Sequence, residues 1–318
     1  MMMSNRRILM SHRRILSFWL FINSFIIKDA DAFSTNTRQQ TVIPPGILGP
    51  PEPLKSLQVG NTLNAFRFVA ADDDDDASDP QKVDFSIERV ANSPNIFILR
   101  NFLTSSECNQ IQTLAEEGGM KTAETITKGD TSSRKNCSVA WVPSSGPHGS
   151  NLVSGLVSST ANIFLSDVVK SHPSVCVEDL QILKYGVGGE FVHHQDGDAR
   201  VLTVIYYING VGGTWFPLAD RNDGDIPKNK AGVMKLVENF EPGKHGIFVK
   251  GTSSNSEQEK SSNKHTVYVN KGDAVAFYNY RDEGSAQLDW AALHCGSPTD
   301  ETKWIANHWF RLNDLSNY

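Results

Sequence analysis

Two histidines and one aspartate have types and spacing that suit a metal site. His194-Gln195-Asp196 lies in a segment that we predict to be a β-strand, in which residues i and i+2 point to the same face. An imidazole and a carboxylate would then project together toward one ion. His294, which follows the apolar turn 290–293, is the best candidate for a third ligand. Two histidines and one carboxylate form the facial triad of non-haem Fe(II) oxygenases, which leaves coordination positions open for a co-substrate and O₂.

The remaining histidines carry weaker signals. His193 neighbours His194 but points to the opposite face of the predicted strand, so we expect it to be structural or to contact substrate. His148, His245 and His265 stand in polar segments and receive no role. A His-x-Asp tripeptide alone is weak support for a metal site, so the surrounding sequence has to decide.

The surrounding sequence resembles the prolyl 4-hydroxylase family of Fe(II)- and 2-oxoglutarate-dependent dioxygenases. The resemblance covers roughly residues 94–313, and every block stands in the order expected for the family. The blocks that carry it are 101–108 (NFLTSSEC), Ser133-Arg134, 180–186 (LQILKYG), 188–196 (GGEFVHHQD), Arg200 with Thr203 and 207–209, 214–217 (TWFP), 271–278 (KGDAVAFY), 293–298 (LHCGSP) and Lys303-Trp304.

The resemblance implies that His194, Asp196 and His294 bind Fe(II). It also implies that Lys303 holds the distal carboxylate of 2-oxoglutarate and that Tyr185 hydrogen-bonds the same end. A buried carboxylate needs a cationic partner, which a lysine on the last strand can supply. The implied reaction hydroxylates peptidyl proline to 4-hydroxyproline and releases succinate and CO₂, with L-ascorbate as the reductant that rescues oxidised iron.

Two departures from the family pattern concern the lysine end of the site. The family lysine usually follows the distal histidine by ten positions, whereas Lys303 follows His294 by nine. The glycine pair before Thr214 also stands one residue closer than usual. If Lys303 is not the anchor, Arg311 on the same predicted strand face is the next residue to test.

Three alternatives remain open at this stage. The same chemistry could act on a lysyl side chain or on a small molecule, or the chain could be a non-catalytic jelly roll that binds a metal or a peptide. Halogenation is disfavoured, because it requires that the carboxylate ligand be absent, and Asp196 is present. The peptide substrate and the oligomeric state cannot be read from the sequence.

The elements that must position these residues indicate an α+β domain. Thr104 to Glu107 forms a capping box ahead of a helix that ends at Gly118-Gly119. A second amphipathic helix is predicted over 151–170. Short strands follow, which together predict a double-stranded β-helix, or jelly roll, supported by the N-terminal helices. The predicted strands are 95–99, 180–185, 190–196, 201–208, 246–249, 266–269, 274–278 and 303–312.

Composition and charge exclude several classes of protein. The 318 residues include 39% hydrophobic and 21% charged residues, an ordinary globular composition. The formal net charge of −6 argues against a partner bound through phosphates, so we expect no nucleic acid. The four cysteines show no zinc spacing. They could form one or two disulfides, and buried free thiols are an equal possibility.

The N-terminal residues predict export and a linker. Residues 1–32 combine four arginines, an apolar run and Ala30-Asp31-Ala32, which is the pattern of a signal peptide, so membrane contact is expected only if this segment is retained as an anchor. The compartment would be the endoplasmic reticulum lumen, or a plastid if Phe33 belongs to a bipartite presequence. Residues 33–84 read as a disordered linker or targeting segment, and 85–318 as the dioxygenase domain with a polar insertion at 219–264, either a functional lid or a mobile loop.

Overall fold

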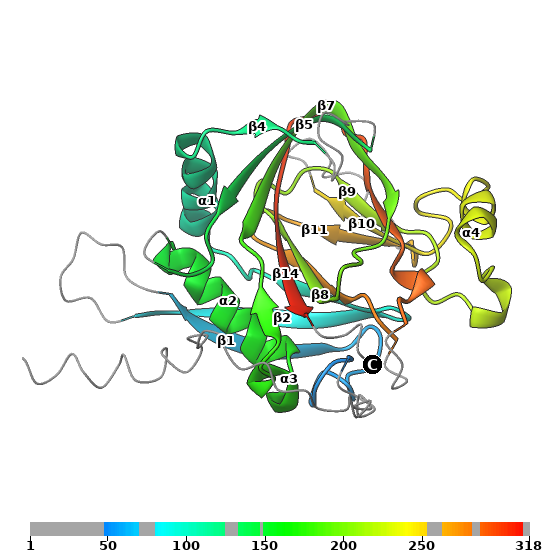
Figure 1. The fold of residues 1–318 in the computed structure, drawn as a ribbon, viewed down its shortest axis with the longest axis horizontal. Helices are drawn as coiled ribbons and strands as arrows, with labels where there is room; N and C mark the ends of the chain where they lie inside the picture. Colours follow the sequence, from blue (N-terminus) through cyan, green and yellow to red (C-terminus); the bar gives the residue numbers. More distant parts are fainter. Residues whose placement is uncertain are drawn as a thin grey trace, which may run out of the picture. The chain divides into compact units, whose positions relative to one another are not determined.

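The computed structural model describes residues 48–69, 80–124, 133–146, 149–252, 263–281 and 287–313. All of them belong to one unit that spans residues 40–318 (Figure 1). The predicted signal peptide and the acidic run Asp72 to Asp76 lie outside the described residues.

A long curled sheet forms most of the described chain (Figure 1). Its strands follow the order β1-β2-β3-β12-β8-β14-β7-β13-β9-β10-β11, while β5 pairs with β7, β4 with β5 and β6 with β14. The strands are β1 Thr62–Val69, β2 Gln81–Asn92, β3 Asn95–Arg100, β4 Lys121–Thr122, β5 Arg134–Val142, β6 Val175–Val177, β7 Leu180–His194, β8 Arg200–Tyr207, β9 Gly213–Phe216, β10 Ile247–Gly251, β11 Thr266–Val269, β12 Ala274–Tyr278, β13 His294–Ser297 and β14 Lys303–Leu312.

The sheet folds back on itself, so that two arms face each other across an apolar interior. Ile205 and Phe277 from β8 and β12 pack in one buried cluster with Phe216 and Val249 from β9 and β10. The Phe216 and Phe277 rings lie 4.9 Å apart and nearly perpendicular. This arrangement confirms the predicted jelly roll.

Helices cover the outer face of the larger arm. These are α1 Ser105–Glu117, α2 Asn151–Phe164 and α3 Asp167–Ser171. The predicted capping box is present, because the Thr104 side chain accepts from the Glu107 N–H and the Glu107 carboxylate accepts from the Thr104 N–H. Phe164 packs on Phe97 of β3 with ring centroids 5.8 Å apart. The prediction of one helix over 151–170 is wrong, since Ser166 caps a new helix with its side chain and breaks the helical run.

The predicted linker is wrong for residues 48–69. Leu48 and Leu54 are buried in the main core, and β1 pairs with β2 along its whole length. Arg67 of β1 forms a buried ion pair with Glu107, in which Nη1 lies 2.8 Å from Oε1. The positive charge of Arg67 is therefore neutralised by Glu107 inside the fold. The acidic run next to β1 in the sequence gave no reason to expect this buried pair.

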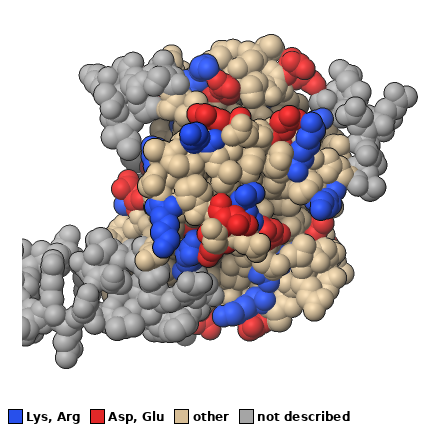
Figure 2. Space-filling view, turned by 90° about the vertical axis from the view of Figure 1, so that its right-hand side faces the viewer, with Lys and Arg blue, Asp and Glu red and all other residues tan. Residues whose placement is uncertain are grey.

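The insertion at 219–264 is ordered up to residue 252. It contains the 3₁₀ helix Asp223–Asp225 and α4 Lys230–Val237. Val233 and Val237 of α4 pack with Trp215 and Leu293 in a separate apolar cluster. On the face in Figure 2, basic and acidic side chains are interspersed rather than gathered by sign. The predicted strand at 246–249 is present as part of β10. The choice between a lid and a mobile insertion stays a prediction for residues 253–262, which lie outside the described residues.

Two further observations bear on the N-terminal and cysteine predictions. Cys108, Cys137, Cys176 and Cys295 are all free thiols. Among the described residues, no helix is both long and apolar enough to cross a membrane.

Candidate metal centre and active site

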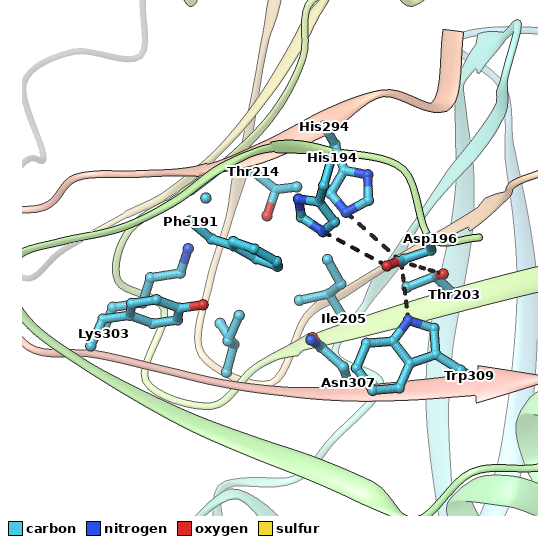
Figure 3. A pocket seen from close by; sticks show the side chains of 13 residues that line it. Phe191, His194, Asp196, Thr203, Ile205, Thr214, His294, Lys303, Asn307 and Trp309 are labelled. Atoms are coloured by element: carbon cyan, nitrogen blue, oxygen red, sulfur yellow. Dashed lines mark hydrogen bonds and ion pairs between the residues drawn. The ribbon is translucent and has the colours of Figure 1, made fainter. Parts of the chain in front are cut away.

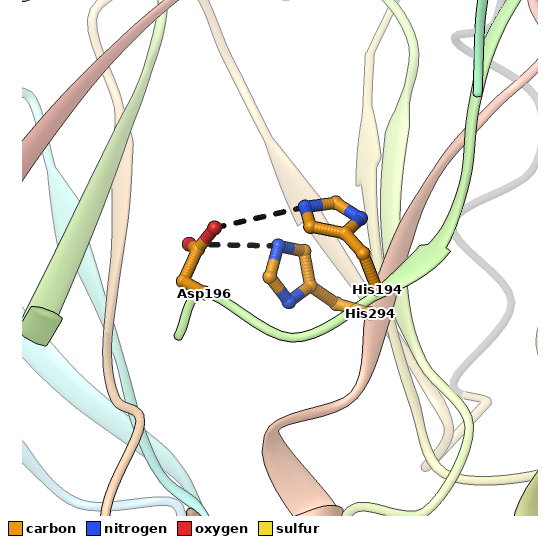
Figure 4. Close-up of side chains that lie close together, drawn as sticks. All are labelled: His194, Asp196 and His294. Atoms are coloured by element: carbon orange, nitrogen blue, oxygen red, sulfur yellow. Dashed lines mark ion pairs between the residues drawn. The ribbon is translucent and has the colours of Figure 1, made fainter. Parts of the chain in front are cut away.

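His194, Asp196 and His294 converge at one end of the barrel interior (Figure 4). Their ligand atoms all lie within 4.8 Å of one another. Nε2 of His194 is 3.7 Å from Oδ1 of Asp196, and Nε2 of His294 is 3.8 Å from Oδ2. Two imidazoles and one carboxylate that face a common position can bind one metal ion as a facial triad.

The sheet register brings the two histidines together. His194 is the last residue of β7 and His294 the first of β13, and the two are directly paired across the antiparallel ladder. The sequence predicted that Asp196 lies within a strand over 190–196. This is wrong, because β7 ends at His194 and Asp196 follows it. The Gln195 side chain donates to the Asp289 carbonyl over 2.8 Å, which ties the Asp196 loop to the segment that precedes His294.

Backbone carbonyls fix the protonation of both imidazoles. Nδ1 of His194 lies 2.9 Å from the Val192 carbonyl, and Nδ1 of His294 lies 2.9 Å from the Ala292 carbonyl. A carbonyl can only accept, so each Nδ1 carries the hydrogen and each Nε2 keeps a lone pair for a metal. Burial, with His294 nearby, lowers the pKa of His194 to about 3, which also favours the neutral ligand form.

Asp196 is held by two hydrogen-bond donors on its Oδ2 atom. Oδ2 accepts from the Thr203 hydroxyl over 2.8 Å and from the Trp309 indole N–H over 3.0 Å. The Thr203 hydroxyl in turn accepts from the Asn279 amide over 2.8 Å. Burial alone would raise the pKa of Asp196, but His294, His194 and the Trp309 donor outweigh it and lower the pKa below its ordinary value. Asp196 is therefore ionised and oriented, and the two imidazoles and one carboxylate would fit Fe(II).

The same pocket contains Lys303 at its other end (Figure 3). Lys303 is 1% exposed, and its Nζ donates to the Gly213 carbonyl over 2.9 Å. Within the described part of the chain, no carboxylate lies in ion-pair range of this ammonium. Burial lowers the pKa of Lys303 to about 8. A buried cation with one neutral partner is suited to binding an anion.

Glycines and an aromatic ring shape the space around this lysine. A Cβ on Gly212 would lie 2.3 Å from the Lys303 side chain, and Gly212 has a φ of 88°. Gly212 therefore makes room for the lysine stem, while a Cβ on Gly213 would instead meet the Phe248 ring. Tyr185 pairs with Lys303 across β7 and β14, and Nζ lies 5.4 Å from the centre of its ring. Tyr185 lines the pocket, and burial raises the pKa of its hydroxyl.

Phe191 lies between the two ends of the pocket (Figure 3). Its ring stacks on that of His194 with centroids 3.7 Å apart, and the Arg134 guanidinium covers it at 4.2 Å. His193 does not line the pocket and instead contacts Trp215 edge to face at 5.4 Å, on the opposite side from His194 as predicted. Arg311 is paired with Glu178 at 3.7 Å, so it does not replace Lys303 in the pocket.

Sequence reasoning assigned no role to two residues that lie beside the metal end. Asn307 and Trp309 line the pocket. With Lys303 and Ile305 they form the period-two series on β14 that faces the pocket. Alternation along the predicted last strand could have identified them, because residues two apart share a face.

Comparisons with known proteins agree with this geometry. Residues 180–311 match the family described as the 2OG-Fe(II) oxygenase superfamily. Probable prolyl 4-hydroxylase 8 of Arabidopsis thaliana is 27% identical over 244 residues, which cover 72% of this chain and 73% of that protein. Prolyl 4-hydroxylase 5 of the same plant is 27% identical over 246 residues, covering 72% of each.

A solved structure is also similar to this chain. The viral collagen prolyl hydroxylase of Paramecium Bursaria Chlorella virus-1 is 19% identical, with a TM-score of 0.43, over 70% of this chain and 98% of that one. The family match covers β7 to β14, which contribute the three candidate metal ligands and Lys303. Residues 180–311 therefore match a 2OG-Fe(II) oxygenase domain, and the chain is a 2-oxoglutarate-dependent dioxygenase. The matched superfamily implies Fe(II) and 2-oxoglutarate.

Proposed function

We propose that this dioxygenase hydroxylates proline residues in peptides or proteins. The observation that carries the proposal is a single pocket. Two histidines and one aspartate lie at one end, and at the other lies the buried Lys303 ammonium, which has no carboxylate partner among the described residues. The names of the curated relatives support proline as the target. The alternatives of a lysyl or small-molecule substrate have no comparable support.

In this proposal each end of the pocket has its own task. His194, Asp196 and His294 bind Fe(II) through Nε2, a carboxylate oxygen and Nε2. With O₂ as the oxidant, bound Fe(II) and 2-oxoglutarate would supply the hydroxylating chemistry, in which one oxygen atom of O₂ enters the proline C–H bond and the other enters succinate as CO₂ is released. Lys303 pairs with the distal carboxylate of 2-oxoglutarate, and Tyr185 adds a hydroxyl donor at the same end. Thr203 and Trp309 hold Asp196 in orientation.

The remaining parts of the proposal rest on the sequence and the family resemblance. L-ascorbate would act as the reductant that keeps the iron in its Fe(II) state. The signal-peptide pattern at residues 1–32 would direct the chain to the endoplasmic reticulum lumen, and a plastid remains the alternative if Phe33 belongs to a bipartite presequence. Residues 48–69 and 80–313 would act as one catalytic unit.

Product analysis tests the proposal. The full chain is incubated with Fe(II), 2-oxoglutarate, ascorbate and proline-containing peptides, and peptide mass and succinate are measured together. We expect one oxygen atom added at proline for each succinate formed, and neither product from the His294→Ala variant. Succinate without peptide oxidation would overturn the assigned substrate, and no succinate at all would favour a non-catalytic binding protein.

A further inference from the structure

A row of three side chains leads from the protein surface to the metal end of the pocket. Trp141 of β5, Gln181 of β7 and Asn307 of β14 are direct neighbours across the ladder, since Gln181 pairs with both of the others. Directly paired residues point to the same side of a sheet. Trp141 is 47% exposed, whereas Gln181 is 4% and Asn307 7% exposed, so the row passes from solvent into the interior.

Arg134 fixes the orientation of both amides in this row. Its Nη2 lies 3.4 Å from Oε1 of Gln181, and an arginine can only donate, so Gln181 must present its oxygen. Nδ2 of Asn307 lies 3.4 Å from that same oxygen, so Asn307 must present its NH₂ group there. The Asn307 carbonyl oxygen therefore points away from Gln181, and it is buried with no hydrogen-bond partner.

A buried carbonyl without a donor lowers stability, so a bound group that donates a hydrogen bond would relieve this cost. Asn307 lines the metal pocket. The co-substrate cannot be that donor, because 2-oxoglutarate is a dianion with acceptor oxygens only at neutral pH. A peptide carries backbone N–H donors, although proline itself has none. The unpaired carbonyl therefore suits the N–H of a residue next to the target proline.

The outer end of the row offers an apolar platform. The exposed Trp141 ring lies 6.2 Å from the buried Trp309 ring at an angle of 39°, and the Trp309 N–H donates to Asp196. Exposed aromatic rings on a rigid strand bind the rings of extended proline-rich peptides.

We propose that the row from Trp141 to Asn307 positions the peptide substrate, with Trp141 packing against an apolar ring of the peptide and the Asn307 carbonyl accepting a backbone N–H beside the target proline. This inference rests on the proposed function, since it assumes a peptide substrate. It assigns substrate contacts to residues that hold neither the metal nor 2-oxoglutarate.

Two end-capped decapeptides, neither with a donor at its termini, test the inference. One alternates proline and alanine, and the other is poly-L-proline, which has no backbone N–H. Each is titrated calorimetrically into the full chain loaded with Fe(II) and 2-oxoglutarate in the absence of O₂. The wild type should bind the alternating peptide about three- to tenfold more tightly, the range expected for one hydrogen bond.

Variants separate the two contacts. Asn307→Leu should abolish the preference for the alternating peptide and leave the Kd for 2-oxoglutarate unchanged. Trp141→Ala should weaken both peptides by roughly tenfold. Phe68→Ala is the matched control, because Phe68 is an exposed aromatic, 57% accessible, on the edge strand β1, and it should change neither Kd.

Three results would overturn the inference. One is equal affinity of the wild type for the two peptides, which needs no variant to fold. Another is an Asn307→Leu protein that keeps the preference for the alternating peptide but whose turnover depends differently on the O₂ concentration. That result would assign the Asn307 carbonyl to a metal-bound water. The third is a Trp141→Ala protein with unchanged Kd values. If the wild type binds and hydroxylates no peptide at all, the proposed function itself fails.

Discussion

The metal end of the pocket and its lysine end hold their charged groups in different ways. At the metal end, Oδ2 of Asp196 and the Nδ1 atoms of both histidines already have hydrogen-bond partners. At the other end, the one hydrogen bond that the Lys303 ammonium makes within the described residues is to the Gly213 carbonyl. The metal end is thus oriented before a ligand arrives, whereas the lysine end lacks its counter-charge until an anion binds. Removing a metal ligand and removing Lys303 should therefore have separable effects.

Loss of a metal ligand should have the largest effect. His294→Ala, His194→Ala or Asp196→Ala should each abolish 2-oxoglutarate turnover, because each removes one of three protein ligands, and bound iron and succinate report the loss. His193→Ala should keep its iron, since His193 contacts Trp215 outside the pocket. An iron-free His193→Ala protein beside an iron-loaded His194→Ala protein would contradict the assigned ligands.

Loss of the lysine should act on the co-substrate alone. Removing one partner of a buried charge pair costs about 3–5 kcal/mol, so Lys303→Ala should raise the KM for 2-oxoglutarate by about a hundredfold or more. Its iron affinity, measured by competition with a chelator, should change little. A parallel loss of iron would show that the two ends are coupled, and an unchanged KM would move the anchor elsewhere.

A smaller effect is expected from the groups that orient Asp196. Thr203→Val removes the hydroxyl donor to Oδ2 at nearly constant volume and should weaken iron binding by about tenfold. Thr214→Val is the matched control, because Thr214 is an equally buried hydroxyl in the same pocket that hydrogen-bonds Tyr207. Equal iron affinities of the two variants would argue that the metal end is not oriented by its hydrogen bonds.

The smallest effect is a pH dependence at the lysine end. Because burial lowers the pKa of Lys303 to about 8, the ammonium loses its proton as the pH rises through that value, and a neutral amine cannot pair with a carboxylate. The Kd for 2-oxoglutarate should stay constant below pH 7 and rise about fourfold between pH 7 and pH 8.5. Lys303→Arg, which stays charged throughout, should bind more weakly but show no such rise.

Much of the sheet could be predicted from the sequence, because buried strands such as Ala274–Tyr278 are short apolar runs between turn residues. The convergence of His194, Asp196 and His294 was also predicted, but for a partly wrong reason. Asp196 lies beyond the end of β7, and its place is set by the bonds from Gln195 and Thr203. The role of these three residues as iron ligands stays a prediction.

Other parts of the fold depend on contacts that a local pattern does not contain. β1 is predicted as part of a linker because it stands between a proline-rich stretch and the acidic run Asp72 to Asp76. Its place in the fold depends on pairing with β2 and on the contact of Arg67 with Glu107, forty residues away. Helix α4 is short, and its apolar side is buried in a cluster that includes Trp215 of β9 and Leu293 from the turn before β13. The orientation of Asn307 depends on Arg134 through Gln181, a chain of contacts over three strands.

The position of β14 has a consequence for how the protein is made. β14 follows every other described strand in chain order, yet it lies between β8 and β7 in the middle of the sheet. A nascent chain that has not reached residue 312 therefore has a gap where Lys303, Asn307 and Trp309 belong. The two sides of that gap are unpaired strand edges, which invite aggregation. Addition of β14 therefore completes the sheet and the pocket together.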